Sequence, residues 1–180
     1  MAFEFSYELR VPKDRIAVII GANGEVKKQL ERATNTSLLM DSQEGVARFE
    51  SDDALGLFAC REIVRAIGRG FNPEIAQLLL KQDYGFELVS VDEYAKSADD
   101  VLRLRGRVIG EGGKARRVIE ELTGCNVCVY GKTVGIIGEF EALVGARRAV
   151  ESLLAGSPHA SVYHWLERRR RELKRRELMS

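Results

Sequence analysis

An internal repeat built around a glycine turn is the sequence feature that most constrains the fold. The stretch GANG at residues 21–24 recurs as GEGG at residues 110–113, an offset of 89. A helical run follows each turn, and two strands and a long helix come next; a strand and a short helix precede each turn. This order predicts two copies of one small α+β unit.

The periodicity of apolar residues supports these assignments. The segments SLLMD and NVCVY, which follow the helices after the two turns, alternate in the manner of strands, whereas Leu143, Ala146 and Val150 have helical spacing. A unit of this length is marginally able to bury a core alone, so two units in one chain are expected. We predict a three-stranded antiparallel sheet covered by helices in each unit.

The chain is expected to divide into four parts. A first unit covers residues 1–70 and a second covers 85–156. Residues 71–84 predict a short linking helix, with Pro73 near its start. Residues 157–180 predict a basic C-terminal helix.

Charge is distributed unevenly along the chain. The formal net charge is +1, but ERRRRELKRRE near the C-terminus carries seven basic and three acidic residues, leaving about −3 elsewhere. The C-terminal helix could bind phosphate or remain solvated. Because the rest of the chain is slightly negative, a phosphate-binding surface on either unit must be a local basic patch.

Other compositional features indicate a cytoplasmic protein without membrane contact. No apolar run is long enough to cross a bilayer, and the N-terminal residues do not resemble a signal peptide. Three cysteines are too few for a disulfide framework, which agrees with a reducing compartment. Cys125 and Cys128 have the spacing of one half of a zinc site. No second cysteine pair or nearby histidine completes such a site, so we expect both cysteines to pack in the core or on a strand.

A glycine turn that opens a helix predicts an anion site, because backbone N–H groups lie unscreened at the positive end of the helix dipole. Basic residues follow both turns. A Walker loop is excluded because Val108 and Ala115 occupy its required glycine and Ser/Thr positions. A dinucleotide fingerprint is excluded because residues 107–109 end a helix instead of a strand. We therefore expect no enzyme activity and no cofactor.

The repeated order of elements resembles the type I KH domain, in which a GXXG turn holds single-stranded nucleic acid. Three longer segments, AIGRGFNPEIAQLLL, VYGKTVGIIG and GSPHASVYHWLERRR, resemble the archaeal two-KH small-subunit assembly proteins, which are related to the eukaryotic partner of the Nob endonuclease. The resemblance implies a non-catalytic factor that binds the 3′ end of small-subunit rRNA, mainly through its second KH unit. It also implies the alpha subunit of initiation factor two and the Nob endonuclease as partners. The alternative is a general KH binder of mRNA or other single strands.

The KH resemblance also assigns candidate RNA-binding residues by position. An acidic segment, DSQEG, beside the first groove and the scarcity of cations before its turn predict weaker binding there. Ile20, Leu38 and Met40 take the places in the first unit that apolar floor residues take in the second. The principal set is Arg107, Ile109, Gly110, Glu111, Gly112, Gly113, Lys114, Arg117, Val127, Val129 and Lys132. The secondary set is Ile20, Gly21, Ala22, Asn23, Gly24, Lys27 and Lys28.

Overall fold

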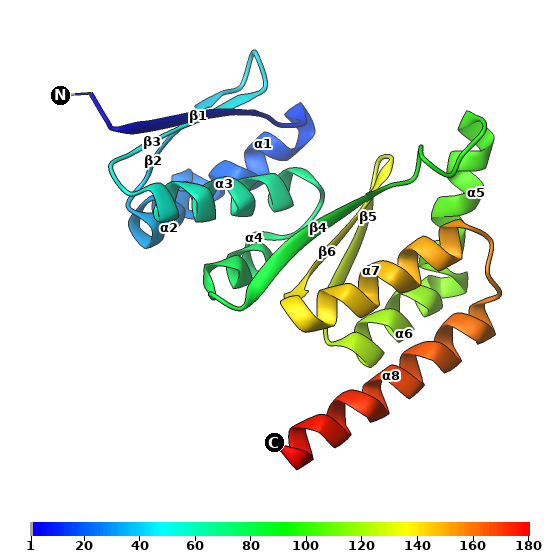
Figure 1. The fold of residues 1–180 in the computed structure, drawn as a ribbon. Coiled ribbons are helices and arrows are strands. Elements are labelled where there is room, and N and C mark those ends of the chain that lie inside the picture. The colour runs from blue at the N-terminus through cyan, green and yellow to red at the C-terminus, as the bar shows by residue number, and fades with distance from the viewer. Residues whose placement is uncertain (1) are drawn as a thin grey trace. The chain divides into compact units, whose positions relative to one another are not determined.

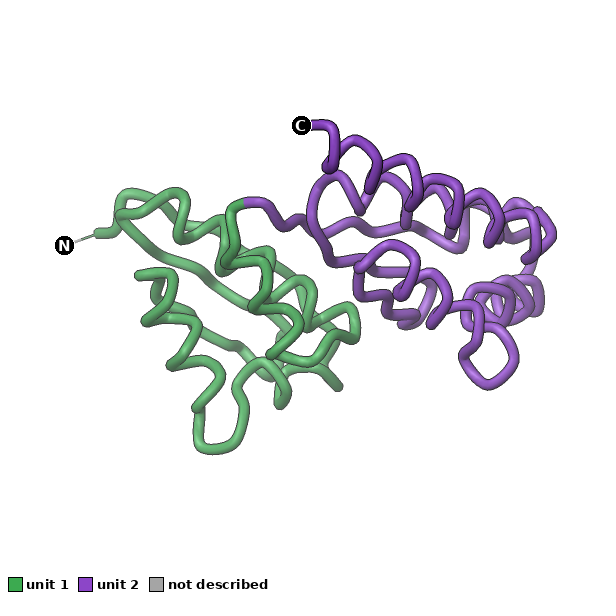
Figure 2. Tube along the Cα trace, turned by 90° about the horizontal axis from the view of Figure 1, so that it is seen from below, with its two compact units in different colours: residues 1–82 green, residues 83–180 purple. Residues whose placement is uncertain are grey.

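The structure, a computed structural model, describes residues 2–180. It divides into two compact units, residues 1–82 and 83–180, which are described separately (Figure 2). The short helices of residues 73–80 pack on the last long helix of the first unit, and the C-terminal helix packs on two helices of the second unit. No helix among the described residues is both long and apolar enough to cross a membrane.

The first unit begins with a strand and two helices joined at the GANG turn (Figure 1). Two strands, a long helix and two short helices complete it. Its elements are β1 (Phe5–Arg10), α1 (Lys13–Ile20), η1 (Ala22–Gly24), α2 (Glu25–Thr34), β2 (Ser37–Asp41), β3 (Val46–Ser51), α3 (Ala54–Gly68), α4 (Pro73–Ala76) and η2 (Gln77–Leu80).

The second unit repeats this order as far as the long helix, which is followed by a C-terminal helix in place of the two short ones. Its elements are β4 (Tyr84–Ser90), α5 (Ala98–Ile109), η3 (Glu111–Gly113), α6 (Lys114–Thr123), β5 (Asn126–Tyr130), β6 (Thr133–Glu139), α7 (Phe140–Leu154) and α8 (His159–Met179). In Figure 1, α8 runs beside α6 and α7, and both of these pairs are in contact.

Each unit contains one antiparallel sheet of three strands. The strand orders are β1-β3-β2 and β4-β6-β5, so the last strand in sequence lies in the centre. The registers are equivalent: Leu38 pairs with Phe49 in the first sheet, as Val127 pairs with Ile136 in the second. The predicted α+β class with two three-stranded antiparallel sheets is therefore confirmed.

The core of each unit lies between its sheet and its helices. In the second unit, Val134 and Ile136 of the central strand are fully buried together with Val108, Ile119 and residues along α7. In α8, Val162 and Leu166 are buried in the same cluster, which fixes the start of this helix on the unit. The remainder of α8 is mostly exposed and basic.

A carboxylate links the second helix of each unit to an edge strand. Glu31 of α2 accepts a hydrogen bond from the amide of Leu38, with N···O 2.8 Å. Glu120 of α6 accepts the equivalent bond from Val127, with N···O 2.9 Å. Both amides are partly buried, so these carboxylates satisfy donors that the sheet leaves unpaired at its edge.

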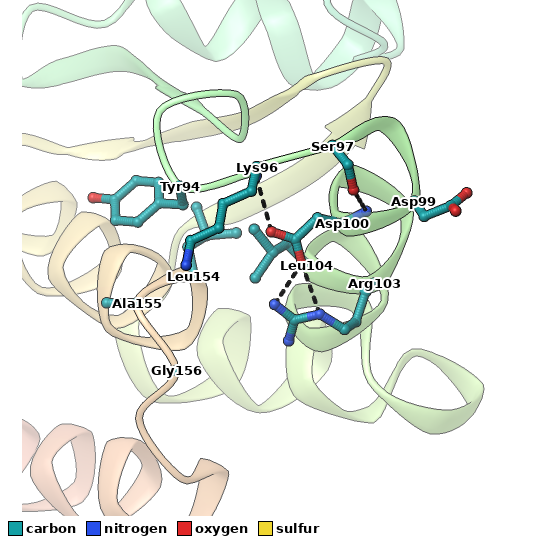
Figure 3. A pocket seen from close by; sticks show the side chains of 10 residues that line it. All are labelled: Tyr94, Lys96, Ser97, Asp99, Asp100, Arg103, Leu104, Leu154, Ala155 and Gly156. Carbon is teal, nitrogen blue, oxygen red and sulfur yellow. Dashed lines mark hydrogen bonds and ion pairs between the residues drawn. The ribbon is translucent and has the colours of Figure 1, made fainter.

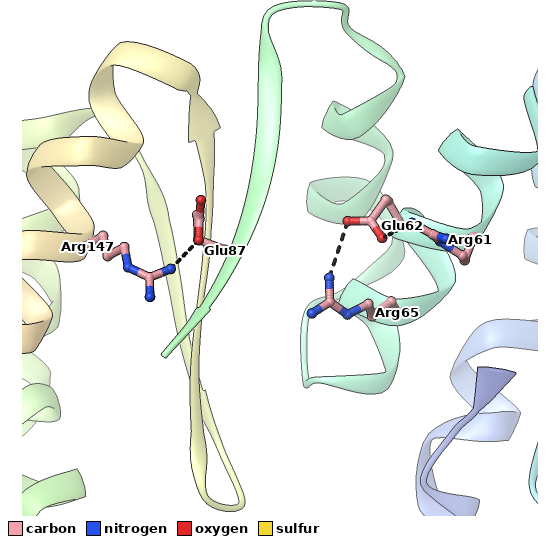
Figure 4. A network of polar contacts seen from close by, with 5 residues as sticks. All are labelled: Arg61, Glu62, Arg65, Glu87 and Arg147. Carbon is pink, nitrogen blue, oxygen red and sulfur yellow. Dashed lines mark hydrogen bonds and ion pairs between the residues drawn. The ribbon is translucent and has the colours of Figure 1, made fainter. Parts of the chain in front are cut away.

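The opposite sheet edge differs between the units. In the second unit, Arg147 of α7 pairs with Glu87 of β4 (Figure 4) and also with Glu151, at 2.8 Å. In the first unit, the corresponding Arg61 of α3 stacks over the Tyr7 ring, 4.8 Å from its centroid. The same helix–strand contact is thus electrostatic in one unit and cation–π in the other.

Replacing Glu120 by alanine should lower the free energy of unfolding by about 1–3 kcal/mol, because the Val127 amide loses its acceptor. Urea denaturation of the full chain measures this change. Glu121→Ala is the matched control, since this neighbouring carboxylate is exposed, and it should change stability by less than about 0.5 kcal/mol. Equal effects of the two substitutions would show that the bond to β5 contributes nothing.

Candidate nucleic-acid interface

The GEGG turn joins α5 to α6 through backbone conformations that favour glycine. Helix α5 ends at Ile109, and Gly110 follows with φ 73° and ψ 171°. Gly112 and Gly113 have φ 58° and 79°, in the left-handed region. The prediction that residues 107–109 end a helix is confirmed, and the turn opens α6 as expected.

The glycines of this turn have different surroundings. A Cβ on Gly110 would lie 2.5 Å from the backbone nitrogen of Ala115, so any side chain there would push the two helices apart. A Cβ on Gly112 or Gly113 would meet nothing within 4 Å. The first glycine therefore permits helix packing, whereas the later two present bare backbone to solvent.

Backbone amides at the turn remain available for an anion. The Gly110 amide donates to the Gly106 carbonyl (2.8 Å), and the Gly113 amide donates to the Gly110 carbonyl (3.1 Å). The amides of Glu111 and Gly112 lie between these two bonded amides in the sequence, and both residues are exposed. They adjoin the positive end of the α6 dipole, which favours a phosphate oxygen.

The basic residues around the turn have two different roles. Lys114 and Arg117 are exposed on the first turns of α6 and form no ion pair within residues 2–180. Arg107 instead donates from Nε to the Leu153 carbonyl (2.8 Å) and from Nη2 to the Ser157 carbonyl (2.5 Å). Its guanidinium therefore holds the α7–α8 connection, although its charge stays beside the turn.

The expected apolar floor is only partly accessible. Val127 is 2% exposed and belongs to the core, whereas Ile109 and Val129 keep partial exposure. The first unit follows the same pattern: Leu38 is fully buried, and Ile20 and Met40 are partly exposed. A bound base could therefore reach one strand residue and one helix residue in each unit.

Lys132 lies in the tight turn between β5 and β6. Its Nζ is 3.4 Å from Asp92 Oδ2, and both side chains are at least half exposed. The carbonyl of Lys132 also accepts a hydrogen bond from the Val91 amide (2.8 Å). Asp92, which sequence reasoning missed, thus moderates the charge at this rim.

Arg105 is a second residue that sequence reasoning missed. It lies four residues before Ile109 and therefore on the same face of α5. Its Nε is buried and has no hydrogen-bond partner among the described residues. The helical period alone could have identified it, because it places a cation one turn from the predicted floor.

The GANG turn of the first unit has the same backbone conformation as the GEGG turn, but fewer unpaired basic side chains lie beside it. Gly21 and Gly24 have φ 75° and 74°, and Asn23 occupies the left-handed region at φ 54°. Ala22 is exposed, as is Lys28 on α2. Lys27 pairs with Glu31, with Nζ···Oε1 3.4 Å, so part of its charge is compensated.

The start of α5 is held by a compact polar cluster that also lines a pocket of about 670 Å³ (Figure 3). Ser97 caps the helix by accepting from the Asp100 amide (3.2 Å), and Asp100 accepts from the Lys96 amide (3.0 Å). This backbone bond, with Arg103, lowers the pKa of the Asp100 carboxyl. The bonds to Asp100 fix the side chain of Arg103, which lies between the start of α5 and the glycine turn.

The cysteines and acids of residues 2–180 form no group of three or more that could hold a metal ion. Cys125 is buried beside the sheet, as the sequence predicted, and burial raises the pKa of its thiol. Burial raises the pKa of the Cys60 thiol to about 11. Both side chains are therefore neutral, packed thiols at physiological pH.

Comparisons with known proteins place KH domains in both units. A family model described as "KH domain" matches residues 6–66, and one described as "Eukaryotic type KH-domain (KH-domain type I)" matches residues 85–171. A KH domain-containing protein of Methanocaldococcus jannaschii is 49% identical over 170 residues, covering 93% of this chain and 75% of that protein. The RNA-binding protein PNO1 of Oryzias latipes is 31% identical over 116 residues, which span 63% of this chain and 48% of the longer relative.

Solved structures agree in fold over nearly the whole chain. Dim2p from Pyrococcus horikoshii is 43% identical, with a TM-score of 0.86 over 92% of this chain and 99% of its own. A P. horikoshii complex of a/eIF2alpha, aDim2p and rRNA contains a chain that is 42% identical, with a TM-score of 0.88 over 93% of this chain and 95% of its own. The resemblance to two tandem type I KH domains is confirmed, and the chain belongs to the two-KH-domain family that includes Dim2p and PNO1.

Proposed function

We propose that this protein is a non-catalytic single-stranded RNA-binding factor of small ribosomal subunit biogenesis, acting in the cytoplasm. Its main contact is the GEGG turn of the second unit, and its target is the 3′ region of small-subunit rRNA. The observation that carries this proposal is the open turn, where exposed amides lie beside the unpaired cations Lys114 and Arg117.

The geometry supports a division between phosphate and base contacts. The amides of Glu111 and Gly112 and the dipole of α6 attract the sugar-phosphate backbone. Ile109 and Val129 offer partly exposed apolar surface for bases, and Arg105 adds a positive charge on the same face of α5 as Ile109. Phosphate contacts give affinity, whereas base contacts give selectivity.

The relatives support the choice of rRNA and of a protein partner. The P. horikoshii aDim2p occurs in a complex with a/eIF2alpha and rRNA. By family membership we propose that this chain binds the corresponding rRNA and the alpha subunit of initiation factor two. The relation to PNO1 supports the Nob endonuclease as a further partner.

Replacing Glu111 and Gly112 together by aspartate should lower RNA affinity at least tenfold, because a second carboxylate joins the one already present at residue 111 and both would then lie at the exposed turn that faces the phosphates. The fold should tolerate the change, since both sites face solvent and Asn23 already occupies the position equivalent to Gly112 with φ 54°. Fluorescence anisotropy measures affinity, and thermal denaturation checks the fold. The control, Ala22→Asp with Asn23→Asp, adds two carboxylates to the first turn instead of one and should still have a smaller effect. Unchanged binding in the first variant would place the RNA elsewhere.

Arg117 and Lys28 occupy equivalent positions in the two units, and neither forms an ion pair within the described chain. Arg117→Gln should reduce the slope of log affinity against log salt by about 0.7, the value for one phosphate contact on a single strand. Lys28→Gln should leave the slope nearly unchanged. Titrations between about 50 and 200 mM salt measure both slopes; a larger change for Lys28→Gln would make the first unit the principal site.

The choice between an rRNA factor and a general KH binder rests on sequence selectivity. We expect single-stranded RNA from the 3′ end of small-subunit rRNA to bind at least tenfold more tightly than a shuffled RNA of equal composition. Competition binding at fixed salt measures the ratio, because salt sets the non-specific contribution. Equal affinities would favour a general single-strand binder.

A further inference from the structure

A pocket opens beside the GEGG turn, next to the start of α8. Its walls come from α5, the turn itself, the first turn of α6 and the first turns of α8. The cavity measures about 410 Å³, within the range of small-ligand sites and large enough for one nucleotide. It is distinct from the surface formed by Ile109 and Val129, neither of which lines it.

The polar lining favours an anion. Arg103, Arg107 and Lys114 bring three positive charges to the pocket, and Glu111 brings one negative charge. Arg103 is held at the rim by two bonds to Asp100 Oδ1, at 2.9 and 2.6 Å (Figure 3). The two carbonyl bonds of Arg107 do not use its Nη1. A phosphate at this position would therefore meet a net positive surface on which the guanidinium groups of Arg103 and Arg107 are already oriented, although Asp100 offsets part of the Arg103 charge.

The α8 side of the pocket is aromatic. His159 and Tyr163 lie one helical turn apart, with ring centroids 6.1 Å apart in an edge-to-face arrangement. His159 Nε2 is 2.8 Å from the Arg107 carbonyl oxygen, which fixes the His159 ring against the end of α5. Aromatic faces beside cations are the elements with which proteins hold unpaired bases and their phosphates.

The α5 side of the pocket is open at Gly106. This residue lies inside the helix and is exposed, and a Cβ there would meet nothing within 4 Å. Glycine weakens a helix interior, and no neighbouring atom in the described chain requires it here. Its presence leaves the space between α5 and α8 free for a ligand.

We propose that this pocket binds one further nucleotide of the RNA strand that crosses the GEGG turn. Lys114 and Arg103 bind the phosphate of that nucleotide, and Tyr163 stacks against its base. The inference rests on the proposed function and extends the contact beyond the four nucleotides that a KH groove holds. It applies to the second unit, because Glu25 replaces Lys114 in the first and the four-residue helix α4 follows α3.

Gly106→Phe tests the proposal by filling the pocket. Wild type and variant are titrated with a four-nucleotide RNA and with the same RNA extended by two nucleotides at each end. Wild type should bind the longer RNA more tightly; the variant should lose about five- to tenfold affinity for it, as expected for one stacked base, and keep its affinity for the short RNA. Val144→Phe on the exposed face of α7 is the size-matched control and should change neither affinity.

Tyr163→Leu provides a second variant that retains apolar packing and removes the stacking surface. It should also lose affinity for the longer RNA only. Equal binding of the longer RNA by wild type and by both variants would overturn the pocket assignment while leaving the GEGG contact intact. If wild type binds neither RNA, the proposed function and this inference both fail.

Discussion

The close approach of Gly110 to Ala115 is the constraint on which the second unit depends. Only hydrogen at residue 110 lets α6 turn back against α5, because a Cβ would come within 2.5 Å of a backbone nitrogen. Gly21 has the same relation to Val26 in the first unit. The first glycine of each turn is therefore required for folding whether or not RNA binds, and the exposure of the following residues is a consequence of that packing.

The two units share this scaffold but differ in the charges that it presents. Lys114 begins α6, whereas Glu25 begins α2. Two residues later the charges are equivalent, since Arg116 pairs with Glu120 at 3.8 Å as Lys27 pairs with Glu31. The difference in free charge is thus concentrated at the first helical residue, where a cation or an anion lies nearest to a bound phosphate.

Local patterns in the sequence predicted the order of elements, the end of α5 and the position of the turns. Those features depend on neighbouring residues, so glycine conformation and apolar period determine them. The burial of Val127 was not predictable in this way. The alternation of apolar residues along a strand assigns each residue to one face of the sheet, but it does not show how fully helices cover that face. The carbonyl groups that Arg107 bonds could not be predicted either, because they lie 46 and 50 residues away in the sequence and come close only in the folded unit.

An arginine on the helix before each glycine turn connects folding to the candidate interface. Arg107 donates to the Leu153 carbonyl in the last turn of α7, and Arg15 donates to the Ile67 carbonyl near the end of α3 (2.9 Å). Each of these carbonyls also accepts from the amide of a following glycine, Gly156 or Gly70, so the guanidinium adds a second donor and places positive charge at the negative end of a helix dipole. Arg107 also donates to the Ser157 carbonyl, two residues before α8, as Arg15 donates to the Phe71 carbonyl (2.8 Å), two residues before α4. The placement of α8 beside the GEGG turn therefore depends on a cation that sequence alone would assign only to RNA.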